Sequence, residues 1–261
     1  MSILDKIVAF KKGEILEYQR ETPLSQLKES PLYHRQGFSI SERLAKPDDF
    51  GIIAEFKRRS PSKPSINLTA DPSIVTPAYE KAGVAGISVL TDSHFFGGGL
   101  SDLMRAREAV NVPLLRKDFI IHEYQVHQAK ASGADFILLI AEILDKPQVQ
   151  DLADLAQSLG LEVLLEMHAI EQVDKYNSSV NVLGINNRNL KTFTTDIRFS
   201  LDQYDALPEE ALKISESGIH SKEAIIQLKE KGYNGFLIGE QFMKSDNPGQ
   251  ACSNFIQSLK S

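Results

Sequence analysis

Eight short apolar runs alternate with helix-type segments from residue 51 onward, and this alternation limits the fold more than any other feature of the chain. The apolar runs cover residues 52–57, 86–90, 113–117, 135–140, 162–166, 182–186, 212–216 and 235–238. Segments with helix start and stop signals lie between them, for example at 71–82, 122–131, 147–158 and 221–231, each with a glycine close behind its end. Strands that alternate with helices predict a parallel sheet.

Two architectures accommodate a sheet of this kind. A doubly wound open sheet prefers fewer strands and a Gly-x-Gly-x-x-Gly turn after the first one, which the sequence lacks. A closed (β/α)8 TIM barrel fits the number of runs, their near-continuous apolarity and the length of 261 residues. We therefore expect an α/β protein in which residues 51–261 form a single (β/α)8 barrel that carries the catalytic site.

Residues 1–50 follow a different pattern. Apolar residues recur at helical spacing from Ile3 to Tyr18, which predicts an amphipathic helix that ends before Pro23. A second short helix is expected at 23–29, and residues 31–47 show no clear period and are predicted to be a connector. We interpret residues 1–50 as a helical N-terminal extension that covers the barrel.

Composition excludes several classes of function. The net charge of -6 argues against nucleic acid or an acidic membrane surface as the main partner. The one cysteine, Cys252, allows neither an intramolecular disulfide nor a cysteine-based metal cluster and suits a reducing compartment. Since the chain shows neither a signal-peptide pattern nor an apolar run near the ~18 residues of a membrane span, we expect a cytoplasmic protein.

Glu55 and Lys57 interrupt the end of the first apolar run. On a strand, residues 53, 55 and 57 share one face, so both charges point the same way. Burying a carboxylate and an ammonium is costly unless they serve each other or a ligand. A structural ion pair is one interpretation, and the basic Ser/Pro loop at residues 58–66 favours a functional site instead.

Polar residues also end other predicted strands, namely Lys117, Glu166, Asn186 and Glu216. Strand alternation places these side chains toward the lumen, at the end of a TIM barrel where active sites form. Two lysines and three glutamates would then meet in one cavity. Mutual ion pairs that only fill the barrel are the alternative, whereas so many charges at one end favour proton transfer on a small anionic substrate.

Two turns suggest a phosphate site. Ser217-Gly218 follows the seventh run and Gly239-Glu240 follows the eighth, where TIM barrels commonly bind phosphate through backbone N–H groups. A glycine after a strand is often only a turn residue. The two turns together favour a phosphate ester.

No metal or cofactor site is expected. The six histidines are scattered, and His122 and His127 lack the four-residue spacing of a helical metal pair. His168, after the fifth run, is interpreted as a loop or cap residue. The segment Phe95-Phe96 before three glycines is expected either to pack locally or to form an apolar wall for an aromatic ligand.

The chain resembles the indole-3-glycerol-phosphate synthases of tryptophan biosynthesis over nearly its whole length. The segments that carry the resemblance are residues 53–62, 88–91 with 96–98, 115–119, 165–166, 184–190, 215–219 and 237–240. The resemblance implies a carboxy-lyase whose substrate is 1-(2-carboxyphenylamino)-1-deoxyribulose 5-phosphate. It implies indole-3-glycerol phosphate, carbon dioxide and water as products, and monomers occur among such enzymes.

The resemblance also implies roles for individual residues. Lys117 matches the general acid of ring closure, and Glu166 a residue of proton transfer during dehydration. Lys57, assisted by Glu55, matches a lysine for substrate carboxylate contact and dehydration. Four residues match substrate-orienting positions: Ser60, Arg188, Asn186 and Glu216, of which the last two are counted in the catalytic group. The phosphate-binding loops are matched by Ser217, Gly218, Gly239 and Glu240. The aromatic ring of the substrate is expected to pack against Phe96 and Pro61.

Three other functions remain open at the level of sequence. A phosphoribosyl isomerase would need an acid/base pair that commonly includes cysteine, and Cys252 lies near the C-terminus. A Schiff-base aldolase would use Lys57 or Lys117 as a nucleophile. A barrel without catalytic activity is the third possibility, against which the matched acids and bases argue.

Overall fold

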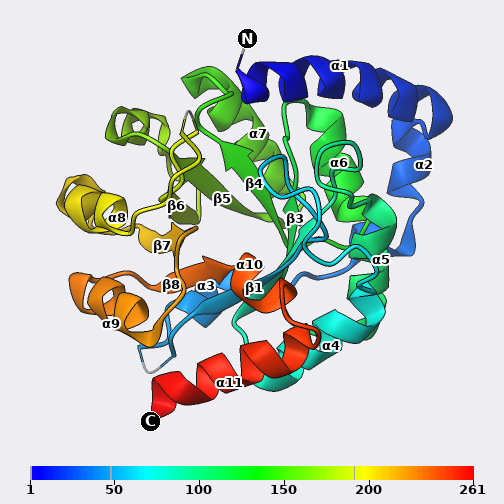
Figure 1. Cartoon of the computed structure of the whole chain (residues 1–261). Helices are drawn as coiled ribbons and strands as arrows, with labels where there is room; N and C mark the ends of the chain where they lie inside the picture. The colour runs from blue at the N-terminus through cyan, green and yellow to red at the C-terminus, as the bar shows by residue number, and fades with distance from the viewer. Residues whose placement is uncertain (1, 48, 191) are drawn as a thin grey trace.

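The computed structural model describes residues 2–47, 49–190 and 192–261 and contains a closed barrel in which each strand pairs in parallel with the next, and β8 with β1 (Figure 1). The predicted TIM barrel is therefore confirmed. The strands are β1 (Ile52–Phe56), β2 (Gly86–Leu90), β3 (Leu114–Lys117), β4 (Phe136–Ile140), β5 (Glu162–Met167), β6 (Val182–Asn186), β7 (Leu212–Glu216) and β8 (Gly235–Ile238).

One face of each strand points into the barrel, and the other packs against the surrounding helices. On β1, Ile53 belongs to the cluster inside the barrel, whereas Ile52, Ala54 and Phe56 pack outward against the surrounding helices. Both faces are buried and, apart from polar residues such as Glu55, apolar, which explains why the strands read as nearly continuous apolar runs. The alternation predicted for the first run is confirmed.

Helices surround the barrel in the order of the chain (Figure 1). They are α4 (Pro72–Ala82), α5 (Leu100–Ala109), α6 (Glu123–Ala131), α7 (Lys146–Ser158), η2 (Ile170–Lys175), α8 (Arg198–Gln203), η3 (Tyr204–Ala206), α9 (Lys222–Lys231), α10 (Glu240–Met243) and α11 (Pro248–Lys260). Side chains of Asp71, His122 and Ser221 cap α4, α6 and α9, at the positions where the sequence predicts these helices to begin. None of the helices among the described residues combines the length and apolarity needed to cross a membrane.

The N-terminal extension contains α1 (Ile3–Glu21), α2 (Leu24–Lys28), η1 (Pro31–His34) and α3 (Ile40–Leu44). The prediction of an irregular connector over residues 31–47 was wrong, because η1 and α3 lie within it. Helices of four or five residues make little more than one turn, too short to show a period in the sequence.

Helix α3 closes the barrel at the amino ends of the strands. Ile40 and Leu44 are buried in the interior cluster, and the Glu162 carboxylate at the start of β5 accepts hydrogen bonds from the backbone N–H groups of Ile40 and Ser41 at 2.9 Å each. Helix α1 lies at the opposite end, along the rim of the barrel beside α6 (Figure 1). The extension thus contacts both ends of the barrel.

Candidate active site

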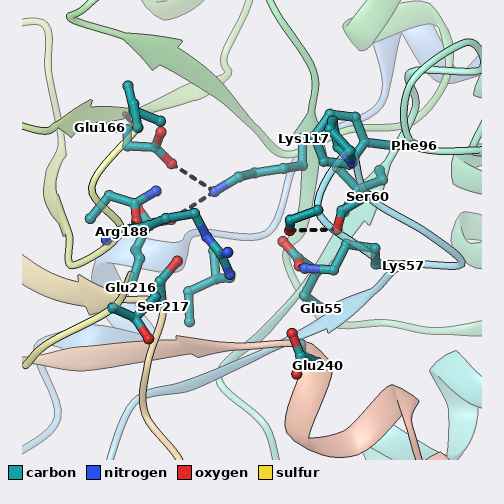
Figure 2. Close-up of a pocket in the computed structure, with 18 of the residues that line it drawn as sticks. Glu55, Lys57, Ser60, Phe96, Lys117, Glu166, Arg188, Glu216, Ser217 and Glu240 are labelled. Atoms are coloured by element: carbon teal, nitrogen blue, oxygen red, sulfur yellow. Dashed lines mark hydrogen bonds and ion pairs between the residues drawn. The ribbon is translucent and has the colours of Figure 1, made fainter. Parts of the chain in front are cut away.

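A cavity of about 360 Å³ opens at the carboxyl ends of the strands. Every residue that the sequence predicts for the site lines this cavity, and Figure 2 shows side chains from several strands pointing into it. These residues are Glu55, Lys57, Ser60, Pro61, Phe96, Lys117, Glu166, Asn186, Arg188, Glu216, Ser217, Gly218, Gly239 and Glu240. The structure therefore brings together groups spread over most of the chain.

The Lys117 ammonium lies between two carboxylates (Figure 2). Its Nζ donates to Glu166 Oε2 at 3.0 Å and to Glu216 Oε2 at 2.6 Å. Burial alone would lower the pKa of Lys117, but the charges of Glu166, Glu216 and Glu55 outweigh it and raise this pKa above its ordinary value. Lys117 therefore remains a cation that can donate a proton or a hydrogen bond.

Glu166 and Glu216 differ in their environment although they share Lys117. Burial raises the pKa of Glu216 to about 8, because the attraction of Lys117 is offset by repulsion from Glu166. Burial acts in the same direction on Glu166, but Lys117 and His168 outweigh it and lower the pKa of Glu166 to about 2. The pair consequently holds one proton near neutral pH, with Glu216 as the more basic partner.

The deeper position of Glu216 explains its proton affinity. Its side chain is 1% exposed, and its Oε1 atom is buried without a hydrogen-bond donor among the residues that the structure describes. Gly184 on β6 leaves room for this atom, since a β-carbon there would lie 2.3 Å from Glu216 Oε1. An unpaired buried carboxylate oxygen favours the protonated acid.

Glu55 and Lys57 form a second acid and base pair on the other side of the cavity. Lys57 Nζ donates to Glu55 Oε1 at 2.5 Å, and Lys57 is the more exposed of the two side chains. Gly239 at the end of β8 lies close by, because a β-carbon there would lie 2.5 Å from Glu55 Oε1. Glu55 thus packs closely against the backbone at Gly239, while Lys57 is the more exposed side chain of the pair.

The loop after β7 has an unusual backbone. Ser217 and Gly218 both have left-handed conformations, with φ of 67° and 74°. The side-chain amide of Asn187 holds this loop by donating to Ser215 Oγ at 2.9 Å and to the Ser217 carbonyl at 3.0 Å. Asn187 was not among the residues predicted for the site, and its two bonds link the segment after β6 to the end of β7 and the loop that follows.

The loop between β1 and α4 lies over the cavity and is tied to its neighbours. Arg58 binds Asp102 of α5 at 2.5 and 2.9 Å, and Arg59 donates to the carbonyls of Ser93 and His94. Lys63 forms an ion pair with the Glu240 carboxylate at the far side. These contacts hold Ser60 and Pro61 at the cavity wall.

Some residues that line the cavity were not predicted from the sequence. Ile3, Leu4 and Ile7 of α1 line it, so the extension forms part of its wall. His168, expected to be a loop or cap residue, also lines the cavity, with its Nε2 atom 3.5 Å from Glu166 Oε1. The spacing of the α1 residues indicates a helix, but it does not indicate which end of the barrel the helix contacts.

Over the residues that the structure describes, no group of three or more His, Cys, Asp or Glu side chains is arranged to hold a metal ion. The cavity instead has an apolar side, where Phe96 and Phe119 lie with ring centroids 5.8 Å apart. The arrangement can bind an aromatic, anionic molecule and transfer protons to and from it.

Comparison with known proteins gives a consistent result. A family model described as "Indole-3-glycerol phosphate synthase" matches residues 4–255. Proteins with that name from Bacteroides thetaiotaomicron and Salinibacter ruber are similar to this chain. The Bacteroides protein is 46% identical over 258 residues, and the match covers 99% of each chain. The Salinibacter protein is 42% identical over 256 residues, and the match covers 97% of this chain and 94% of the other.

Solved structures of other proteins share the fold. A 3-hexulose-6-phosphate synthase from Salmonella typhimurium has a TM-score of 0.64 at 12% identity, over 80% of this chain and 98% of that one. A tryptophan synthase subunit alpha from Legionella pneumophila has a TM-score of 0.60 at 15% identity, over 85% of this chain and 96% of that one. At such low identity the likeness extends to the barrel fold alone.

Proposed function

This chain belongs to the indole-3-glycerol phosphate synthase family, and we propose that its cavity closes the indole ring of 1-(2-carboxyphenylamino)-1-deoxyribulose 5-phosphate. The products are indole-3-glycerol phosphate, carbon dioxide and water. The observation that carries the assignment of residues is the Lys117 ammonium, held between Glu166 and Glu216 inside an open cavity.

Ring closure requires an acid at the substrate ketone. The aromatic carbon that bears the carboxylate forms a bond to the ketone carbon, and the ketone oxygen takes up a proton. Lys117 supplies this proton, and its raised pKa keeps it charged until the substrate oxygen becomes basic enough to accept it. Loss of carbon dioxide then returns its bonding electrons to the ring and restores aromaticity.

Dehydration requires an acid and a base. The new hydroxyl group leaves as water after it receives a proton, and a proton leaves the carbon next to the ring nitrogen as the double bond forms. Glu166, whose lowered pKa keeps it ionised, and Lys57, paired with Glu55, supply these two functions. Glu216 and Asn186 orient the reacting part of the substrate.

The remaining residues bind the substrate. Lys57 also contacts the substrate carboxylate before it departs, and Phe96 and Pro61 line the side of the cavity that receives the aromatic ring. Arg188, Ser60 and the backbone N–H groups of Ser217, Gly218, Gly239 and Glu240 bind the sugar phosphate end. The Glu240 carboxylate is turned to Lys63, which reduces its repulsion of the phosphate.

The environment of the cavity disfavours two other functions. A Schiff-base aldolase needs a neutral lysine, whereas both candidate lysines are in ion pairs. Glu166 and Glu216 bind Lys117, and Glu55 binds Lys57. A phosphoribosyl isomerase that uses cysteine would need this residue in the cavity, but Cys252 is buried in α11.

We also propose that the protein acts in the cytoplasm as a monomer, without nucleic acid or a membrane as partner. The net charge of -6 supports the absence of a polyanionic partner. Light scattering on the purified protein checks the oligomeric state, since a mass of twice 29.0 kDa would contradict the monomer.

The reaction is tested by mixing the protein with the proposed substrate and following the growth of indole fluorescence. Lys117→Ala is expected to lower turnover about a thousandfold. The variant lacks the general acid of ring closure and the cation that balances the charges of Glu166 and Glu216. Lys12→Ala, which removes an exposed lysine of α1, serves as the matched control and should retain full activity. No fluorescence growth with folded parent protein would overturn the proposed reaction, and full activity in Lys117→Ala would overturn the role of Lys117.

A further inference from the structure

Lys11 of α1 is a buried cation outside the groups assigned to the reaction. Its side chain is 1% exposed, although it belongs to a surface helix of the extension. The ammonium meets three carboxylates: Glu14 of the same helix at 2.7 Å, and Asp92 and Asp118 of the barrel at 2.9 Å each. One side chain therefore joins α1 to the loops that follow β2 and β3.

Asp118 connects Lys11 to the strand end that carries the proposed general acid. It follows Lys117 directly in the chain, and its Oδ1 atom accepts the backbone N–H of Phe119 at 2.8 Å. Its Oδ2 atom accepts Thr91 Oγ1 at 2.6 Å and Arg116 Nη2 at 3.0 Å. Asp118 thus retains a cation partner in Arg116 if Lys11 is removed.

Asp92 connects Lys11 to the aromatic wall of the cavity. Its Oδ1 atom accepts the backbone N–H groups of Phe95 at 2.6 Å and Phe96 at 3.1 Å, while its Oδ2 atom lies against Lys11. The Asp92 side chain is 0% exposed, and over the described part of the chain Lys11 is the cation paired with it. The position of the Phe96 backbone therefore depends on a carboxylate that Lys11 neutralises.

The same helix supplies a second part of the wall. Ile7 lies one turn before Lys11, and Ile3 and Leu4 lie one turn further, on the side of α1 that lines the cavity. Lys11 consequently fixes two apolar surfaces relative to each other, one on α1 and the other at Phe96. A buried ion pair of this kind adds little to stability compared with apolar side chains, whereas it does define one geometry.

We propose that Lys11 is a positioning residue that fixes the apolar wall for the aryl ring of the substrate, by holding α1 and the Phe96 loop against the end of β3. The inference rests on the proposed function, because it assumes a ligand with an aryl ring. Lys11 takes part in no chemical step. Loss of Lys11 is expected to weaken binding of the aryl group and to leave binding of the phosphate group intact.

The experiment compares Lys11→Met with Lys12→Met, which changes an exposed lysine on the same helix. Steady-state kinetics should show KM raised about tenfold in Lys11→Met with kcat within about threefold of the parent, and no change in Lys12→Met. Equilibrium binding should show about tenfold weaker affinity for indole-3-glycerol phosphate and unchanged affinity for glycerol 3-phosphate, which has no aryl ring. Equal loss of both ligands, or no loss of either, would overturn the proposal.

A second variant and a measurement without ligand complete the test. Asp92→Asn keeps an oxygen for the N–H groups of Phe95 and Phe96 but removes the charge that faces Lys11, so it should show the same selectivity even if Lys11→Met does not fold. Amide hydrogen exchange at Phe95 and Phe96 should become faster in both variants and not in Lys12→Met. Failure of the parent to turn over substrate would overturn the proposed function, whereas unchanged exchange at these two amides would overturn the inference alone.

Discussion

Gly184 sets the space available to the Glu216 carboxylate in the cavity. A β-carbon at this position would lie 2.3 Å from Glu216 Oε1 and 3.1 Å from Leu164 Cδ1, so the carboxylate has to move if any other residue is present. Displacement of Glu216 also disturbs Lys117, which donates to it at 2.6 Å. The absence of a β-carbon at Gly184 thus allows the observed positions of Glu216 and Lys117.

We expect Gly184→Ala to lower kcat about a hundredfold, because a displacement of the order of one ångström is costly in a catalytic site. The crowding should also destabilise the protein by about 1–3 kcal/mol. The matched control is Gly13→Ala in α1, where a β-carbon would meet no atom within 4 Å. Gly13→Ala should retain activity and gain about 1 kcal/mol of stability from helix propensity; an active Gly184→Ala would show that the Glu216 position is not critical.

The raised pKa of Glu216 makes the stability of the protein depend on pH. Its pKa is about 8 in the folded protein and 4.5 in an ordinary environment, so the folded state binds this proton more tightly than the unfolded state does. The contribution to stability is therefore fully present below about pH 4.5 and is lost as the pH rises through about 8.

Glu216→Gln should flatten this part of the profile, because an amide does not titrate. Urea unfolding from about pH 5 to about pH 9 checks the prediction, with stability of the parent falling more steeply than that of the variant. Glu17→Gln, at an exposed position of α1, is the control and should follow the parent. Parallel curves for parent and Glu216→Gln would contradict a raised pKa at this residue.

At the scale of elements, the strand ends and the first helix of the extension were predictable, whereas the end of the barrel that this helix contacts was not. Period-two alternation assigns Glu55, Lys117 and Glu216 to the lumen from the sequence alone, since a strand has only two faces. The place of Ile7 in the cavity depends instead on which end of the barrel α1 contacts, and this is decided by Lys11 reaching Asp92 and Asp118 far along the chain. No local pattern contains that information.

The loop of residues 58–66 is the element expected to move. It is anchored by Arg58 on Asp102 and by Lys63 on Glu240, with Ser60 and Pro61 between these anchors facing the cavity. Because the Lys63 side chain is 52% exposed, its ion pair contributes little and can open for the ligand to enter. The same pair can form again over bound ligand.

We expect binding of indole-3-glycerol phosphate to slow amide hydrogen exchange in residues 58–66 about tenfold, because closure excludes water from this loop. Amides of α11, which does not line the cavity, provide the internal control and should be unaffected. Unchanged exchange in 58–66 at saturating ligand would show that the loop does not close.

At the scale of the whole molecule, we propose that extension and barrel fold as one unit. Ile7, Ile15, Ile40 and Leu44 of the extension are each no more than 4% exposed. Burial of four such side chains is worth about 6–12 kcal/mol, which is comparable to the total stability of about 5–15 kcal/mol of a typical protein. The barrel alone would lack most of that contribution.

Deletion of residues 1–50 should therefore abolish cooperative unfolding and expose apolar surface. Urea unfolding followed by circular dichroism, together with binding of a hydrophobic dye, checks this outcome. Deletion of residues 1–21 alone removes α1 but keeps α3 under the barrel, and should leave a folded protein of reduced stability. A stable and cooperative fragment of residues 51–261 would contradict the single unit.

The pairing of β1 with β8 has a consequence for how the molecule forms on the ribosome. Ile52 pairs with Phe236, so strands from opposite ends of the barrel sequence must meet before the sheet closes. Contacts this distant in sequence slow folding, and β1 cannot complete its pairing until β8 has been synthesised. Gly239 comes to lie against the Glu55 carboxylate only when β8 has paired with β1. A nascent chain therefore has no complete cavity until β8 and Gly239 have been synthesised.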